Sequence, residues 1–118
     1  MREHKYRGMN AETGQWVYGY YTKLVEGIRR FDAIIADIDG VLTRFYIHDP
    51  KTIGEYTGNK DKNGKEIYED DILHTNEADW TAKVIWHYDG FMLTGLDNTG
   101  FSCSPDYDKC EIIGNLHQ

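Results

Sequence analysis

Several features of other protein classes are missing from this chain of 118 residues. No apolar run approaches the roughly 20 residues that a membrane-spanning helix needs, so the sequence predicts no membrane association. The first six residues, MREHKY, contain no apolar stretch, and we therefore expect no signal peptide. With only two cysteines present, we expect Cys103 and Cys110 to be free thiols in a reducing cytoplasm.

Positive charge is also scarce, since 13 Lys and Arg face 20 Asp and Glu, for a net charge of −7. An acidic protein repels a phosphate backbone, so nucleic-acid binding is disfavoured. The exception is a basic N-terminal stretch, for which an ordinary charged surface is the simplest interpretation. A nucleic-acid-binding barrel that uses this stretch remains an alternative, as does contact with the acidic part of another copy. Its members are Arg2, Lys5, Arg7, Lys23, Arg29 and Arg30.

Helical periodicity is absent, and turn dipeptides organise the chain instead. Asp39-Gly40, Asn63-Gly64 and Asp89-Gly90 each lie between strand-like segments. Asn, Asp and Gly tolerate the positive φ angles of type I′ turns, so each dipeptide predicts a β-hairpin. The two segments 34–38 and 41–47 flank the first dipeptide, and we expect them to pair. Residues 15–24 are expected to pair with residues 3–8, and residues 110–114 to form a closing strand.

One predicted strand has a clear buried face. Trp80, Ala82, Val84 and Trp86 alternate with polar residues, which predicts that these four side chains point into the core. Two short helical turns are expected, one at 49–53 with Asp49 as N-cap, and one within 24–31. The residues from 48 to 60 are rich in turn formers and are the softest candidate boundary.

The segment AIIADIDGVLT resembles the first motif of haloacid-dehalogenase-type phosphatases. In that family the two aspartates act with Mg²⁺ as nucleophile and general acid, roles that would fall to Asp37 and Asp39. That fold needs a parallel sheet with crossover helices, which the helix-poor pattern does not supply. We therefore predict that the pair belongs to a hairpin and that the protein is not an enzyme.

The segment 59–70, NKDKNGKEIYED, imitates an EF-hand calcium loop. Asn59, Asp61 and Asn63 would supply the first ligands, but Asp70 stands where a bidentate Glu is usual, and no helices flank the segment. A turn at Asn63-Gly64 is the better interpretation. The five histidines and two cysteines show no paired metal-ligand spacing, so the sequence predicts no metal and no cofactor.

The segment 53–72, IGEYTGNKDKNGKEIYEDDI, resembles the signature of the YopX family of phage and prophage proteins. The opening MREHKYRGMN, the block WVYGYY and the closing EIIGNL are also similar to that family, so the resemblance spans nearly the whole chain. One residue departs from it, because Asp70 stands where the family usually has Gly. At a positive φ angle, Asp would be tolerated there with some strain.

The resemblance implies one mainly β, antiparallel domain over 1–118. It would have an N-terminal β-hairpin region (1–50) and an SH3-like, partly closed barrel in the C-terminal region (51–118), centred on residues 66–116. It also implies a cytoplasmic, non-enzymatic phage accessory protein that binds an unknown protein partner or assembles with itself. The family carries no catalytic residues to transfer.

The motif residues would have a structural role or form an interaction face. Tyr56, Ile67, Tyr68 and Ile72 are expected to pack, while Glu66 and Asp71 are expected to accept backbone hydrogen bonds. The candidate binding residues are Tyr56, Thr57, Gly58, Asp61, Asn63, Gly64, Glu66, Tyr68 and Asp71.

Overall fold

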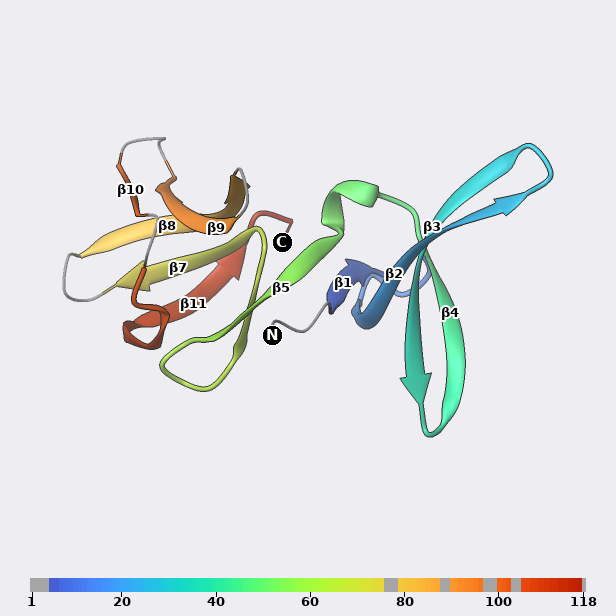
Figure 1. The fold of residues 1–118 in the computed structure, drawn as a ribbon, viewed down its shortest axis with the longest axis horizontal. Helices are drawn as coiled ribbons and strands as arrows, with labels where there is room; N and C mark the ends of the chain where they lie inside the picture. Colours follow the sequence, from blue (N-terminus) through green and yellow to red (C-terminus); the bar gives the residue numbers. More distant parts are fainter. Residues whose placement is uncertain (1–4, 76–78, 88–89, 97–99, 103–104, 118) are drawn as a thin grey trace. The chain divides into compact units, whose positions relative to one another are not determined.

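The computed structural model describes residues 5–75, 79–87, 90–96, 100–102 and 105–117. Within them the chain is mainly β with antiparallel pairing, as predicted, and its only helical elements are two 3₁₀ turns (Figure 1). Arg2, Tyr88, Asp89 and Cys103 lie outside the described residues. The elements are β1 (Tyr6–Met9), β2 (Trp16–Glu26), β3 (Arg29–Ile38), β4 (Val41–Ile47), η1 (Pro50–Thr52), β5 (Gly54–Lys60), β6 (Glu66–Tyr68), β7 (Asp71–Thr75), β8 (Trp80–His87), β9 (Gly90–Gly95), β10 (Phe101–Ser102), η2 (Tyr107–Lys109) and β11 (Cys110–Asn115).

The chain folds into two compact units that divide between Glu55 and Tyr56. In the first unit the strands are hydrogen-bonded in the order β4-β3-β2-β1, and β1 also pairs with the start of β5. An isolated antiparallel bridge joins Asn10 to Ile47. The 3₁₀ turn η1 begins after Asp49, whose carboxylate accepts a hydrogen bond from the Lys51 amide, as the N-cap prediction requires.

The β3–β4 hairpin forms where the Asp39-Gly40 dipeptide predicted it. Ile38 pairs with Val41, so the loop has two residues, and both adopt positive φ, 52° at Asp39 and 84° at Gly40. This is the type I′ geometry, which matches the right-handed twist of the flanking strands.

The expected helical turn within residues 24–31 is wrong. Glu26 pairs with Arg29 across a second two-residue hairpin loop that begins at Gly27, whose φ angle is 63°. Glycine at the first loop position is the residue that type II′ turns favour, so the glycine that weakens a helix here supports a hairpin.

The core of the first unit lies along β3. Ala33 and Ile34 are both fully buried, and because successive strand residues point to opposite faces, β3 is covered on both faces at this point. The Phe31 and Tyr46 rings pack edge to face with centroids 5.3 Å apart. At Gly19 a Cβ atom would lie 2.1 Å from the Ile35 carbonyl oxygen, so only glycine allows β2 and β3 to approach this closely.

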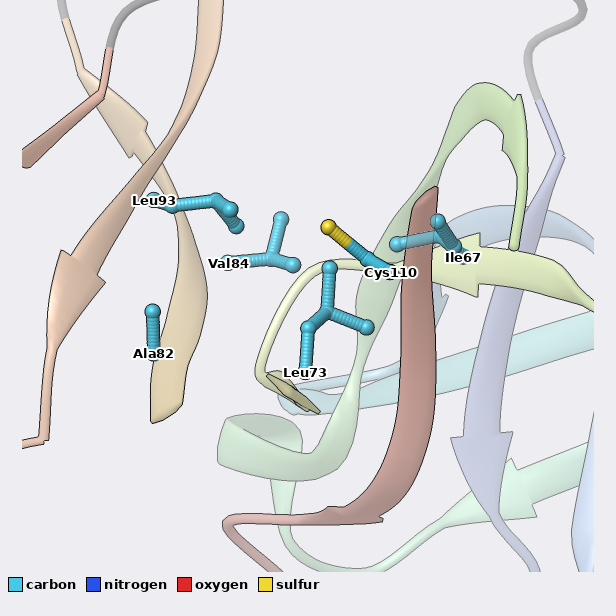
Figure 2. Packing of buried hydrophobic residues seen from close by; sticks show 6 residues of the cluster. All are labelled: Ile67, Leu73, Ala82, Val84, Leu93 and Cys110. Atoms are coloured by element: carbon cyan, nitrogen blue, oxygen red, sulfur yellow. The ribbon is translucent and has the colours of Figure 1, made fainter. Parts of the chain in front are cut away.

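The second unit contains a five-stranded antiparallel sheet in the order β10-β9-β8-β7-β11, and the end of β5 pairs with β6. Its core gathers residues from five of these elements (Figure 2). Figure 2 shows the side chains of Leu73, Val84, Leu93 and Cys110 directed toward a common centre, with Ile67 beside Cys110. No closed barrel is found in the described part of this unit.

The predicted buried face of β8 is confirmed at Ala82 and Val84, which are almost completely buried, and Trp80 packs against the core. It is wrong at Trp86, which is 42% exposed. Trp86 lies next to the end of the β8–β9 hairpin, where the sheet extends past its core, and its ring packs edge to face on Phe91 at 4.7 Å.

Gly90 pairs with His87 and belongs to β9, whereas Asp89, the other residue of the predicted Asp89-Gly90 turn, lies outside the described residues. The predicted turn at Asn63-Gly64 needs correction. At Asn63-Gly64 only Gly64 has a positive φ, of 81°. The Gly64 amide donates to the Asp61 carbonyl and the Asp61 amide donates to the Lys65 carbonyl. This pattern is a type I turn closed by a left-handed glycine, not a type I′ turn.

Candidate protein-interaction site

Asp61 organises the loop at the centre of the motif. Its carboxylate is buried and accepts three backbone hydrogen bonds, from Asn63 and Lys65 at 2.9 Å each and from Ile112 at 3.1 Å. Burial alone would raise the pKa of this carboxyl, but the three hydrogen bonds outweigh it and hold the pKa below its usual value. Asp61 therefore fixes the turn and ties it to β11.

The aromatic and hydroxyl groups of the motif also point inward. The rings of Tyr56 and Tyr68, both buried, lie 5.4 Å apart. The Thr57 hydroxyl donates to the Ile67 carbonyl at 2.9 Å, and the oxygen of that hydroxyl accepts a hydrogen bond from the Asn59 amide. The packing predicted for Tyr56, Ile67 and Tyr68 is confirmed, whereas Ile72 is only half-buried.

The two predicted carboxylate acceptors differ in what they hold. Asp71 is almost completely buried and accepts a hydrogen bond from the Tyr68 amide at 2.8 Å, as expected. Glu66 accepts a hydrogen bond from the Tyr68 hydroxyl, a side-chain donor, at 3.1 Å, and its predicted backbone hydrogen bond stays a prediction. Gly58 has a φ angle of 87° and is exposed, as are Asn63 and Gly64.

Asp70 occupies the left-handed conformation, with a φ angle of 72°, at the position where the resemblance leads one to expect glycine. Both backbone groups of Asp70 are hydrogen-bonded: its amide donates to the Val84 carbonyl, and its carbonyl accepts from the Leu116 amide. Its carboxylate lies 2.9 Å from His117 Nε2. No local sequence pattern indicated this contact with His117, because the two residues are far apart along the chain.

A shallow hollow of about 470 Å³ lies beside the motif, lined by Tyr56, Gly58, Asn59, Lys60 and residues 105–108. A hydrogen bond with Asp106 raises the pKa of the Asp108 carboxyl.

Among the described residues no group of three or more His, Cys, Asp or Glu side chains is arranged to hold a metal ion. In the EF-hand-like segment, both carboxylate oxygens of Asp61 face backbone amides.

The phosphatase-like pair lies on the β3–β4 hairpin. Asp37 is exposed near the end of β3, and its carboxylate accepts a hydrogen bond from the Gly40 amide at 2.8 Å. Asp39 is the first residue of the turn. The strands that surround the pair are antiparallel, so the parallel strand end that carries such a motif is not formed by the described residues.

The exposed apolar side chains of the first unit form what we call the hairpin surface. Two of its members, Val25 and Ile28, lie at the end of the β2–β3 hairpin, and Ile28 is completely exposed. Three more lie at the end of the β3–β4 hairpin, where Leu42 is 72% exposed. The ends of the two hairpins point in different directions within this unit (Figure 1). The whole set is Tyr18, Tyr20, Val25, Ile28, Ile38, Val41, Leu42 and Tyr46.

Charge distinguishes the two units. Residues 1–55 carry eight basic and eight acidic side chains, whereas residues 56–118 carry five basic and twelve acidic side chains. The hairpin surface thus belongs to the electrically balanced unit. Large exposed apolar side chains, such as those at each hairpin end, are typical of protein–protein contact sites. A second hollow, of about 490 Å³, lies next to it between Phe31, Tyr46, Ile47 and their neighbours.

The basic N-terminal stretch does not form one patch of exposed cations. Arg7 is buried, with its guanidinium 4.3 Å from the centre of the Trp16 ring. Arg29 and Arg30 are exposed near the β2–β3 turn, and Lys23 is exposed on β2. Arg7 is therefore part of the packing of the first unit, which removes one of the cations on which the nucleic-acid interpretation relied.

The comparisons with known proteins give one family. The model of the YopX family, described as YopX protein, matches residues 5–118. No match is found among curated proteins. No helix in the described part of the chain is both long and apolar enough to cross a membrane. Because the family model covers nearly all of the sequence, including the motif and both units, the chain belongs to the YopX family.

Proposed function

We propose that this protein is a small phage or prophage accessory protein that acts without catalysis, by binding another protein or by assembling with itself. The observation that carries this proposal is the hairpin surface, where Tyr20, Val25, Ile28 and Leu42 are each at least two-thirds exposed. Exposing large apolar side chains to water costs free energy that is recovered when a partner covers them. The family resemblance supports a phage origin and a location in the cytoplasm of the bacterial host.

The motif has a different part in this proposal. Its buried polar groups, Thr57, Asp61 and Asp71, are hydrogen-bonded within the second unit. We take them to be the framework that holds the β5–β6 loop against β11 and keeps β6 beside β7. In this proposal the second unit is an SH3-like barrel left open, and association takes place on the first unit.

Affinity capture from prophage-induced host cells, combined with light scattering of the pure protein, tests the proposal. The variant carries Ile28→Lys and Leu42→Lys, which place charge at both hairpin ends. The matched control is Phe101→Lys, which changes a side chain that is 70% exposed on the second unit. We expect capture or self-association to be lost in the double variant and kept in the control. Association that is unchanged in the double variant would contradict the proposal.

A further inference from the structure

The strand β4 is the outer strand of the first unit. Asn10 and Ala11 cover its edge at Ile47 and Tyr46, but residues 41–45 lack the features that normally protect such a strand from pairing with another chain. Unprotected edges present a row of free amide and carbonyl groups, and proteins usually shorten them, break them with a bulge or place lysine or proline on them. β4 has seven residues, pairs with β3 in unbroken register, and contains no proline and one charged residue, Arg44.

The outer strands of the sheet in the second unit are protected in the usual ways. β10 contains only two residues. β11 has a register shift between Ile112 and Gly114, which interrupts its ladder. The contrast between these outer strands and β4 indicates that the open part of the β4 edge is available to pair with a strand of another chain.

The hydrogen-bonding direction of β4 follows from two observations. In a two-residue hairpin the pair next to the loop, here Ile38 and Val41, is hydrogen-bonded, so Val41, Thr43 and Phe45 direct their backbone groups toward β3. Leu42 and Arg44 therefore direct theirs outward. The Ala11 amide donates to the Tyr46 carbonyl at 3.4 Å, which shows that Tyr46, the next residue of that alternating set, also faces outward.

We propose that β4 pairs antiparallel with β4 of a second copy of this chain, about a two-fold axis that passes between the two Thr43 residues. This proposal rests on the proposed function and names the partner of the hairpin surface. Residues 1–55 carry equal numbers of basic and acidic side chains, so the charges of the first unit itself add no net repulsion to the contact. A two-fold contact uses the same edge on both chains, so it closes at a dimer.

The side chains select this register among the possible ones. Pairing centred on Thr43 places each Leu42 opposite the Arg44 of the second copy, so that the outward backbone groups exchange about four hydrogen bonds. It also places Val41 opposite Phe45 and Thr43 opposite Thr43, and these aromatic with β-branched and Thr with Thr pairs are favourable across strands. A register centred on Arg44 would instead bring two guanidinium groups together.

Cysteine cross-linking tests the register directly. In a chain with Cys103→Ser, Thr43→Cys is expected to form a disulfide-linked dimer under mild oxidation, because a non-hydrogen-bonded pair on a two-fold axis brings the Cβ atoms close. Val41→Cys is the matched control, since it would face Phe45. The remaining native thiol, Cys110, is buried. Equal linking at both positions, or none at Thr43→Cys, would overturn the proposal.

A charge series measured by analytical ultracentrifugation tests the same contact without cross-linking. Leu42→Lys places a cation opposite Arg44 and is expected to weaken the dimer by tenfold or more, whereas Leu42→Glu places an anion there and is expected to keep or tighten it. Phe101→Lys, on the second unit and 70% exposed, is expected to leave the dissociation constant unchanged. A wild-type chain that stays monomeric at millimolar concentration would overturn the proposal, while partner capture through the hairpin surface would still support the proposed function.

Discussion

Replacing Asp61 by asparagine is expected to destabilise the second unit strongly, although the two side chains have the same size. The buried carboxylate accepts from three backbone amides, one of them, Ile112, on β11. Asparagine has a single acceptor oxygen, so at least one amide then faces an NH₂ group. A buried amide without a partner costs about 1–3 kcal/mol, and the remaining hydrogen bonds lose the contribution of the charge. The expected cost to the free energy of unfolding is about 2–4 kcal/mol.

The assay is equilibrium unfolding in urea, followed by the fluorescence of Trp80 and Trp86, which belong to the same unit. Asp79→Asn is the matched control, because the Asp79 side chain is 95% exposed, and a change within about 0.5 kcal/mol is expected there. An Asp61→Asn variant that unfolds at the wild-type midpoint would contradict this structural role of Asp61. A rise of the wild-type midpoint in millimolar Ca²⁺, caused by ligand binding at this loop, would contradict it as well.

The pH dependence of the same carboxylate follows from the direction of its shift. The hydrogen bonds hold the pKa of Asp61 below 3.8 in the folded protein, so folding is favoured by the ionised form. Its contribution is complete above the unfolded pKa and is lost as the pH falls through the folded one. We expect wild type to lose more stability than Asp61→Asn as the pH falls below about 4, the ordinary pKa of an aspartate, measured by urea unfolding.

Three further outcomes follow from the structure. Leu73→Ala is expected to cost about 2–5 kcal/mol in urea unfolding because Leu73 is almost completely buried, whereas Trp86→Ala is expected to cost about 1–2 kcal/mol, mainly from its ring contact with Phe91. Asp39→Ala is expected to lower the stability by about 1 kcal/mol, since alanine disfavours the positive φ of the turn, and Asp39→Asn is expected to be neutral within about 0.5 kcal/mol. Hydrolysis of an aryl phosphate with Mg²⁺ is expected to be at background in wild type and unchanged in Asp37→Asn; activity that Asp37→Asn abolishes would contradict the non-enzymatic proposal.

Local signals predicted the strands and one turn well because they depend on short-range chemistry. The Asp39-Gly40 turn and the Asp49 cap each depend on backbone preferences within four residues. The alternation of β8 likewise predicted the burial of Ala82 and Val84. The alternation predicts which side chains of a strand lie on the same face. It does not predict where along the strand the core ends, which is why Trp86 was predicted to be buried.

The candidate site was harder to predict, since it depends on contacts between distant segments. The motif residues were recognised from their pattern, but the hydrogen bond from Ile112 to Asp61 and the contact between His117 and Asp70 join residues that no local rule connects. The hairpin surface was not predicted, because an apolar side chain in a strand is normally expected to be buried. Val41, Leu42 and Ile28 are apolar, and only the fold shows that they are left in solvent.

In our proposal, association takes place on the first unit and the family motif supports the fold of the second. A dilution series of the ¹⁵N-labelled chain, followed by amide chemical shifts, separates this proposal from association through the motif. Raising the concentration is expected to shift the amide resonances of residues 38–46, with Leu42 and Arg44 among the largest changes, while those of residues 56–72 do not change. Shifts confined to residues 56–72 would contradict it, because the motif itself would then be the association face.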